Sequence, residues 1–287
     1  MMTAFDARVT PARSDLAAKH LEGQVEAEQF VAGELREVVE AQAPLRRTRE
    51  LDAPLDTEAL RGERVTIYEE DGEGWCWGQL VADGYVGFLP QQALARPGPE
   101  PTHRVAALRT FVFPGPSIKL PPLMALSLGS RVAAARVDAS FAFLVRGGCI
   151  PVQHLAPADT HETDFVAVAE RFVGVPYLWG GKTSLGIDCS GLVQVALNAA
   201  GIACLRDSDM QERALGSPVG VDNEKIAFQR GDLIFWKGHV AIVRDDATLV
   251  HANAYHMAVK IEPIADTVRR IAEAGSAVTS VRRLSAV

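Results

Sequence analysis

Cys189 is the residue of this 287-residue chain whose setting best suits a catalytic nucleophile. It follows an irregular glycine-rich stretch, and the apolar residues after it recur at three- and four-residue spacing up to Gly201, which predicts a helix. Cys189 would then lie in the first helical turn, where free N–H groups and the helix dipole favour an anion. We expect this setting to lower the pKa of the thiol from about 8.5. The same N–H groups could stabilise the oxyanion that forms when the sulfur attacks a carbonyl.

Two histidines are placed to assist such a nucleophile. Three strand-like apolar runs follow one another with short turns between them; the first ends at Trp236, the second begins at His239, and the third contains His251. An antiparallel hairpin could bring both rings to one face, with His239 as the base and His251 as the residue that orients it. Zinc could also bind Cys189 and the two histidines, but no fourth ligand is evident, so we predict neither a metal nor another cofactor.

Five short segments carry a resemblance to a known family. They are Pro176–Gly181, Asp188–Val193, Gly231–Leu233, His239–Ile242 and Val250–Ala252. In this order they resemble the sequence blocks of the NlpC/P60 cysteine peptidases. The resemblance implies a papain-like α+β catalytic domain, here residues 160–287. It also implies hydrolysis of cell-wall peptides at the bond between γ-D-glutamate and a diamino acid.

The resemblance also implies roles for individual residues. The nucleophile, the general base and the orienting residue fall on Cys189, His239 and His251. Tyr177 matches the family's active-site tyrosine, and Asp188 and Ser190 match positions that help bind the amino-terminal end of the substrate. The residues alone suggest a second role for Asp188, because aspartate directly before a helix is a preferred N-cap. One carboxylate could do both.

The chain before residue 160 is rich in short alternating strands, glycine and proline. Within residues 43–97, the patterns Gly62–Val65, Gly74-Trp75 and Gly84–Gly87 resemble a bacterial SH3 (SH3b) domain. Residues 101–156 repeat parts of this pattern more weakly, which predicts a second, degenerate SH3-like barrel. The predicted fold class is therefore α+β, with a papain-like NlpC/P60 catalytic domain preceded by two small SH3-like β-barrels.

Two parts of the N-terminal half are interpreted separately. We expect residues 1–42 to form one or two helices that pack on the barrel or on the catalytic core. In SH3-bearing relatives of the peptidase family, the first barrel contributes to the pocket that recognises a free amino terminus. The resemblance makes Tyr85 the candidate for that role in this chain.

Composition and charge exclude several classes of partner. The formal net charge of −7 is scattered along the chain, which argues against a nucleic-acid partner. No run approaches the roughly 18 apolar residues of a membrane span. The first 30 residues are rich in charge and lack the apolar core of a signal peptide, so we expect a cytoplasmic protein. Since no C-x-x-C pair is present, Cys76, Cys149 and Cys204 are expected to be buried free thiols.

Together these features predict a cysteine endopeptidase that recycles murein peptides with the sequence L-Ala-γ-D-Glu-diamino acid. If Asp188 binds the free amine of the alanine, a muramyl-linked stem would leave that carboxylate unpaired and would be rejected. Three alternatives stay open. The chain could be an exported hydrolase of intact peptidoglycan, a papain-like thiol acyltransferase or amidase, or a non-catalytic wall-binding protein built on its SH3b barrels.

Overall fold

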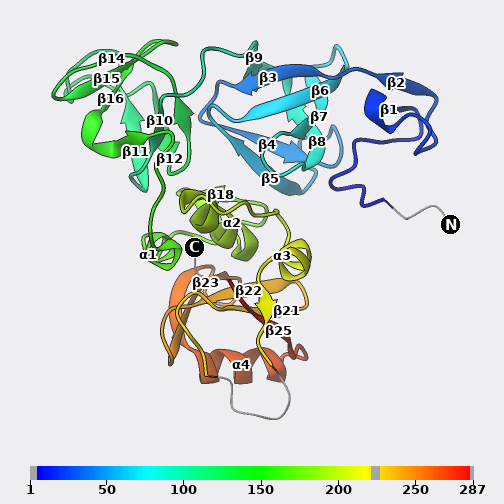
Figure 1. Ribbon diagram of the computed structural model, residues 1–287. Helices are drawn as coiled ribbons and strands as arrows, with labels where there is room; N and C mark the ends of the chain where they lie inside the picture. Colours follow the sequence, from blue (N-terminus) through cyan, green and yellow to red (C-terminus); the bar gives the residue numbers. More distant parts are fainter. Residues whose placement is uncertain (1–4, 221–226, 285–287) are drawn as a thin grey trace. The chain divides into compact units, whose positions relative to one another are not determined.

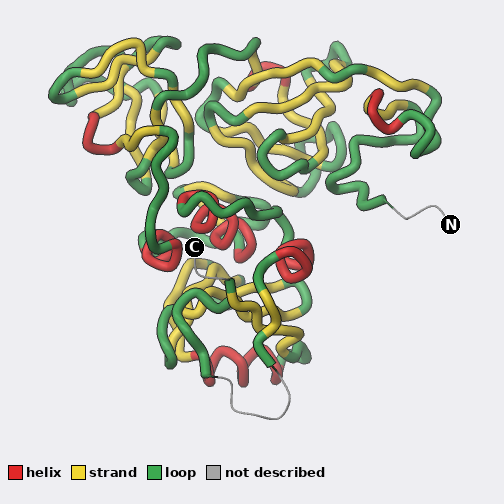
Figure 2. Tube along the Cα trace, viewed as in Figure 1, coloured by secondary structure: helices red, strands yellow, loops and turns green. Residues whose placement is uncertain are grey.

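A computed structural model describes residues 5–220 and 227–284. The chain divides into two compact units, residues 1–160 (unit 1) and 161–287 (unit 2). Among the described residues, unit 1 consists of strands and short 3-10 turns, and the four α-helices all lie in unit 2 (Figures 1 and 2). Each unit is described below by itself.

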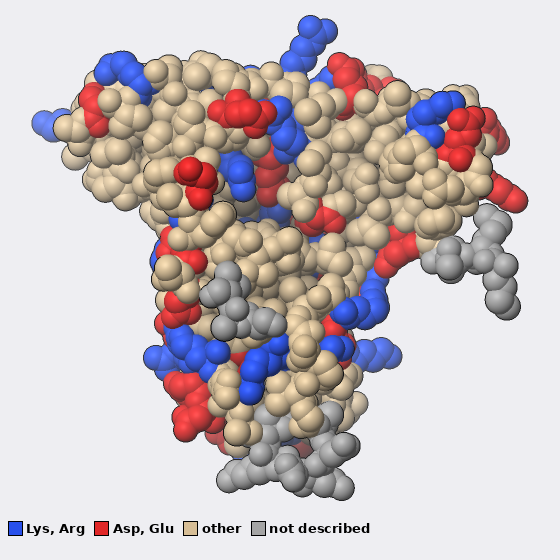
Figure 3. Space-filling model, viewed as in Figure 1, with Lys and Arg blue, Asp and Glu red and all other residues tan. Residues whose placement is uncertain are grey.

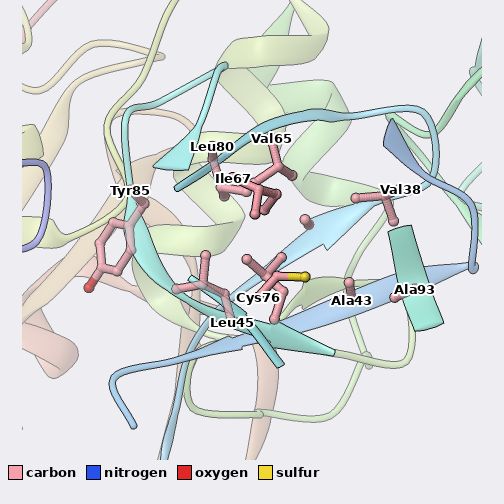
Figure 4. Packing of buried hydrophobic residues seen from close by; sticks show 11 residues of the cluster. Val38, Ala43, Leu45, Val65, Ile67, Cys76, Leu80, Tyr85 and Ala93 are labelled. Atoms are coloured by element: carbon pink, nitrogen blue, oxygen red, sulfur yellow. The ribbon is translucent and has the colours of Figure 1, made fainter. Parts of the chain in front are cut away.

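The first half of unit 1 is a barrel-like sheet of seven strands in the order β5-β4-β8-β7-β6-β3-β9. Its elements are β3 Glu34–Val38, β4 Gln42–Arg46, β5 Leu55–Leu60, β6 Arg64–Glu70, β7 Trp75–Leu80, β8 Val86–Pro90, the 3-10 turn Gln91–Ala93 and β9 Leu94–Ala95. Strand alternation sends two sets of side chains to opposite faces. Aliphatic residues such as Leu45, Ile67 and Leu89 form the core with Tyr85 (Figure 4). The aromatic residues Trp77 and Phe88 belong to a separate cluster.

The expectation of helices in residues 1–42 is wrong. The described part of this segment contains β1 Leu16–Ala18, the 3-10 turn Lys19–Leu21, β2 Gln29–Val31 and the barrel strand β3. β1 and β2 pair in parallel, and Leu16 packs in the aromatic cluster with Trp77. Gly23 interrupts the segment with a φ of 78°, a conformation that favours glycine. The barrel therefore begins with β3, before the predicted boundary at residue 43.

The second half of unit 1 follows a similar element order with shorter strands, except that two strands, β13 and β14, stand in the place of β6. Its elements are β10 His103–Val105, β11 Arg109–Val112, β12 Met124–Ser127, β13 Arg131–Val132, β14 Ala134–Val137, β15 Phe141–Leu144, β16 Cys149–Pro151, the 3-10 turn Val152–His154 and β17 Leu155–Pro157. The pairings β10-β17, β11-β12 and β15-β16 correspond to β3-β9, β4-β5 and β7-β8 in the first half. A small aliphatic core of its own includes Val105, Leu126 and Ile150.

Unit 2 contains a six-stranded sheet in the order β20-β25-β21-β22-β23-β24. Its elements are α1 Phe165–Glu170, β18 Lys182–Thr183, β19 Gly186–Ile187, α2 Cys189–Ala199, α3 Ser208–Ala214, β20 Ser217–Pro218, β21 Leu233–Trp236, β22 His239–Val243, β23 Thr248–Asn253, β24 Ala258–Pro263, α4 Ile264–Glu273 and β25 Val278–Arg283. The predicted helix after Asp188 and the three predicted strands from 233 to 253 are confirmed. Helix α4 packs its residues Ile264 and Val268 on one face of the sheet, and α2 contacts β22 and β23.

On the face of the molecule that Figure 3 shows, acidic and basic side chains are interspersed, and neither sign of charge dominates. Among the described helices, none is long and apolar enough to cross a bilayer.

Candidate active site

Asp188 and the glycines around it set the start of helix α2. The Asp188 carboxylate caps the helix by accepting a hydrogen bond from the Gly191 N–H, at 2.7 Å from Oδ1. Oδ2 accepts from the Gly180 N–H at 2.8 Å, which ties the glycine-rich loop to the helix. Residue 191 must be glycine here, because a Cβ would lie 2.3 Å from the Gly181 carbonyl oxygen. Cys189 is consequently held as the first residue of α2.

The Cys189 sulfur is buried beside the beginning of β22. Only 7% of the residue is exposed, and the sulfur accepts hydrogen bonds from the backbone N–H groups of Val240 and Ser190. Since Val240 follows His239 in the chain, the sulfur lies next to the residue that carries the expected base. Cys189 at the start of α2 and His239 at the start of β22 thus belong to neighbouring elements of unit 2, and proton transfer between them stays a prediction.

The expectation that the helix start lowers the pKa of Cys189 is wrong. Burial raises it to about 12, and the negative charge of Asp188 adds to this rise. The two N–H groups and the Arg206 charge act in the expected direction, but the loss of hydration outweighs them. The thiol of the free protein is therefore neutral at neutral pH, and it needs a base to become a nucleophile.

His239 and His251 meet across adjacent strands of the sheet. The Nε2 atom of His239 lies 2.9 Å from Nδ1 of His251, and β22 pairs with β23 in antiparallel register. Burial lowers the pKa of His239 to about 3, and the charges of His251 and Arg270 lower it further. Burial also lowers the pKa of His251, which is 1% exposed. Both rings are neutral at neutral pH, so His239 can accept a proton from the thiol.

A carboxylate that the sequence analysis did not identify stands behind the two histidines. Glu262 Oε2 lies 2.7 Å from Nε2 of His251, and Arg270 Nη2 donates to both Glu262 oxygens at 2.8 Å. His256 Nε2 lies 3.2 Å from Glu262 Oε1. The pairing register of β23 and β24 is the feature that identifies Glu262. Glu262 lies opposite Leu249, and Leu249 and His251 point to the same face of the sheet because they are two residues apart on β23.

Arg206 is a second residue that the sequence analysis missed. Its side chain is 1% exposed and forms a bidentate pair with Asp188, with Nη1–Oδ1 at 2.9 Å and Nη2–Oδ2 at 2.8 Å. Nη1 also donates to Ser190 Oγ at 2.8 Å, and the Ser190 hydroxyl donates to Asp188 Oδ1 at 3.3 Å. The side-chain amide of Gln211 anchors the loop by donating to the Ser190 and Leu205 carbonyls.

These contacts change what Asp188 and Ser190 are expected to do. With Gly180, Gly191, Ser190 and both Arg206 nitrogens, five donors within the protein address the Asp188 carboxylate. A carboxylate has about four lone-pair sites, so the capacity of Asp188 to accept hydrogen bonds is filled by donors of the protein. The geometry thus supports the capping role of Asp188 and an ion-pair role beside it. The predicted contacts of Asp188 and Ser190 with a substrate amine stay predictions.

The two predicted tyrosines lie in different units. Tyr177 follows α1 in unit 2, and the charges of Cys189 and Asp188, after burial, raise the pKa of its hydroxyl. Its backbone N–H donates to the Met257 carbonyl at 2.9 Å. Tyr177 is therefore close to the nucleophile. Tyr85 is 3% exposed in the barrel of unit 1, at the edge of the core cluster, with its hydroxyl directed away from the aliphatic side chains (Figure 4). Its predicted role stays a prediction.

The arrangement in unit 2 suits acyl transfer through a thioester. It provides a buried thiol at the start of α2, a neutral imidazole on the neighbouring strand β22, a second imidazole that holds the first, and backbone N–H donors at the sulfur. Within residues 5–220 and 227–284, no three or more His, Cys, Asp or Glu side chains come together as a metal site.

Comparison with protein families matches both units. Residues 174–271 match the NlpC/P60 family, and residues 45–94 match the bacterial dipeptidyl-peptidase SH3 domain. The first match contains Tyr177, Cys189 and both histidines of the site, and it ends just after Arg270.

Individual relatives extend over most of the chain. A gamma-D-glutamyl-L-lysine dipeptidyl-peptidase of Bacillus cereus is 28% identical over 73% of this chain and 71% of its own length. A protein of the same name from Bacillus subtilis is 26% identical over 76% of this chain and 78% of its own length. The crystal structure of an NlpC/P60 family protein from Bacillus cereus superposes with a TM-score of 0.71 at 23% identity, covering 87% of this chain and 99% of that one. This last likeness concerns the fold.

Proposed function

Because this chain is an NlpC/P60 family peptidase that carries a bacterial SH3 domain, we propose that it hydrolyses the γ-D-glutamyl bond to a diamino acid in peptidoglycan-derived peptides. The observation that carries the chemistry is the Cys189 sulfur at the Val240 N–H, next to His239, whose ring is held 2.9 Å from His251. The bond to be cut is suggested by the names of the Bacillus relatives, which match most of the chain.

In the acylation step, the thiol proton moves to His239 as the Cys189 sulfur attacks the γ-carbonyl carbon. The oxyanion that forms is stabilised by backbone N–H groups at the start of α2. The tetrahedral intermediate collapses with cleavage of the C–N bond, and His239 donates its proton to the leaving α-amine of the diamino acid. The products are the free diamino acid end and a thioester on Cys189.

In the deacylation step, water attacks the thioester while His239 takes one of its protons. The C–S bond breaks, the sulfur regains the proton, and the dipeptide leaves with a new carboxylate. His251 keeps the His239 ring oriented in both steps. Since both rings are neutral before substrate arrives, the base does not have to lose a proton first.

We further propose that the substrate enters with a free amino terminus, as L-Ala-γ-D-Glu-diamino acid. A dipeptidyl-peptidase releases two residues from the amino-terminal end, and the Bacillus relatives carry that name. A muramyl group would replace the ammonium by a bulky, uncharged amide, which a pocket built for an ammonium rejects. Such peptides arise from turned-over wall, so in this proposal the enzyme works on recycled fragments in the cytoplasm.

The test is mass spectrometry of the products from three defined substrates. These are the free tripeptide, its N-acetylated form and the same stem linked to muramic acid. We expect release of the diamino acid from the free tripeptide only. Equal cleavage of the muramyl-linked stem would instead favour hydrolysis of intact wall. If none is cut but an acyl-lipid or simple amide is, the chain is a different thiol enzyme. If none of these substrates is cut, wall binding by unit 1 is left as the alternative. Fractionation of cells tests the cytoplasmic location.

A further inference from the structure

The contacts behind His251 continue the pair of histidines to two residues, Glu262 and Arg270, that lie outside the five short segments quoted in the sequence analysis. Glu262 Oε2 lies 2.7 Å from His251 Nε2, and His251 Nδ1 lies 2.9 Å from His239 Nε2. Glu262 is itself fixed from α4, where Arg270 Nη2 donates to both carboxylate oxygens. Four side chains from β22, β23, β24 and α4 are thus joined in one line of hydrogen bonds that ends at the base.

The direction of each hydrogen bond in this line follows from the ionised carboxylate. A carboxylate only accepts, so Nε2 of His251 must carry a proton and donate it to Glu262. In a neutral ring the other nitrogen is then unprotonated, so Nδ1 of His251 accepts from Nε2–H of His239. The remaining nitrogen of His239, Nδ1, carries a lone pair. It is the only ring nitrogen of the two histidines left to take a proton.

We propose that Glu262, held by Arg270, is a positioning residue that fixes the tautomers of His251 and His239 and so keeps Nδ1 of His239 free to accept the Cys189 proton. The inference rests on the proposed function for the meaning of that proton transfer. The hydrogen-bond directions themselves do not depend on it. Glu262 touches neither substrate nor sulfur in this role, and it acts through the two rings.

The groups that face Glu262 keep it ionised. They are His251 from β23, His256 from the turn after β23, and Arg270 from α4. The hydrogen bond with His251, followed by those with His256 and Arg270, lowers the pKa of Glu262 to about 2 against the opposing effect of burial. Arg270 also makes a cation–π contact with Tyr255, whose ring centroid lies 4.2 Å from the guanidinium carbon of Arg270. The acceptor at His251 is therefore present throughout the neutral pH range.

Glu262→Gln tests the proposal because it keeps the shape but replaces one oxygen by an N–H donor. If that donor faces His251, Nε2 of His251 becomes the acceptor, and the proton moves to Nδ1. His239 Nε2 must then accept, and its Nδ1 carries the proton that blocks the base. Asp→Asn next to a catalytic histidine costs about 10⁴-fold in kcat. With one more ring in between, we expect kcat to fall at least tenfold and KM to stay within twofold. Lys260→Gln is the matched control, because it removes a charge from an exposed side chain on the same strand.

Two measurements test the positioning role of Glu262 without any substrate. In ¹⁵N NMR, wild type is expected to carry the protons on Nε2 of both His239 and His251, whereas Glu262→Gln moves at least part of them to Nδ1. Alkylation of Cys189 by iodoacetamide at neutral pH should slow in the same variant and not in Lys260→Gln. If wild type cuts none of the peptides, the function fails while the NMR result still decides the role of Glu262.

Because the amide of Glu262→Gln can also present its oxygen to His251, Glu262→Leu, which has no acceptor, decides that case. Unchanged tautomers in both variants would overturn the proposal, whether kcat is retained or falls together with the melting temperature. The second case would mean that Glu262 only holds α4 on the sheet. If Glu262→Gln does not fold, Glu262→Asp decides, since it keeps an ionised acceptor. It should preserve both Nε2–H tautomers, and a proton on Nδ1 of its His251 would overturn the proposal.

Discussion

The buried pair between Asp188 and Arg206 makes a sharp prediction about stability. Asp188→Asn removes one negative charge but keeps a side chain that caps helices as well as aspartate does. Arg206 stays behind, 1% exposed, with a charge that no longer has its bidentate partner. The cost of the variant is therefore the cost of an uncompensated buried charge, separated from the cost of a lost cap.

A second aspartate in unit 2 provides the matched control. Asp164 caps α1 by accepting from Val166 and Ala167, and it pairs with Arg230 at 2.8 Å. Here the side chains of Asp164 and Arg230 are 44% and 39% exposed. Breaking a buried pair costs about 3–5 kcal/mol, whereas an exposed pair contributes about 0–1 kcal/mol. The two Asp→Asn variants thus differ in burial and share the chemistry of the change.

Differential scanning calorimetry measures the difference. For a unit of this size, 1 kcal/mol shifts the melting temperature by about 3–5 °C. We expect Asp188→Asn to lower it by about 10–20 °C and Asp164→Asn by no more than about 5 °C. Equal losses in the two variants would refute the reasoning, because burial would then contribute nothing. An unchanged melting temperature in Asp188→Asn would show that the Asp188–Arg206 pair is not buried in solution.

Three further predictions concern the site. Cys189→Ala should abolish release of the diamino acid without lowering the melting temperature by more than a few degrees. Cys204→Ala, which removes another buried thiol of unit 2, should retain activity. Turnover by Cys189→Ala would contradict the assignment. The pKa of His239 is lowered to about 3 from 6.5, so the unfolded chain binds the proton first and stability is lost as pH falls from about 6.5 toward 3. Over that pH interval, the melting temperature of His239→Asn should fall less than that of the wild type. An equal fall in the two proteins would contradict this prediction. Because the pKa of Cys189 is raised to about 12, its alkylation rate should keep rising above pH 8, whereas a thiolate–imidazolium pair would give a plateau from acid pH.

Local pattern was enough to predict the elements that hold the reacting groups. The spacing after Asp188 predicts α2, and the apolar runs and turns predict β21, β22 and β23, because each signal lies within a few residues. The residues that hold the site together were missed because their partners are distant in the chain. Arg206 lies 18 residues from Asp188, and Glu262 lies 11 residues from His251. Their roles depend on a loop path and on a strand register that the sequence pattern does not specify.

The direction of the Cys189 pKa shift was missed for a different reason. A helix start favours an anion when water or a ligand solvates it, and the sequence shows the helix start but not the burial. Residues 1–42 were misjudged in a similar way. They were expected to form one or two helices that pack on the barrel or on the catalytic core, whereas β3 gains its stability from pairing with β6 and from burying Val38 in the barrel.

The two missed arginines lead to one physical account of the site. At Cys189, the charge of Asp188 raises the pKa and that of Arg206 lowers it; at His239, the charge of Arg270 lowers the pKa and that of Glu262 raises it. At each group, the effect of the carboxylate on the pKa is thus opposed by that of an arginine. Burial is left as the largest influence on the pKa of both Cys189 and His239. Thiol and imidazole stay neutral, and the hydrogen bonds still fix their positions. In the proposed mechanism, the proton then moves from sulfur to His239 as the sulfur attacks the substrate carbonyl.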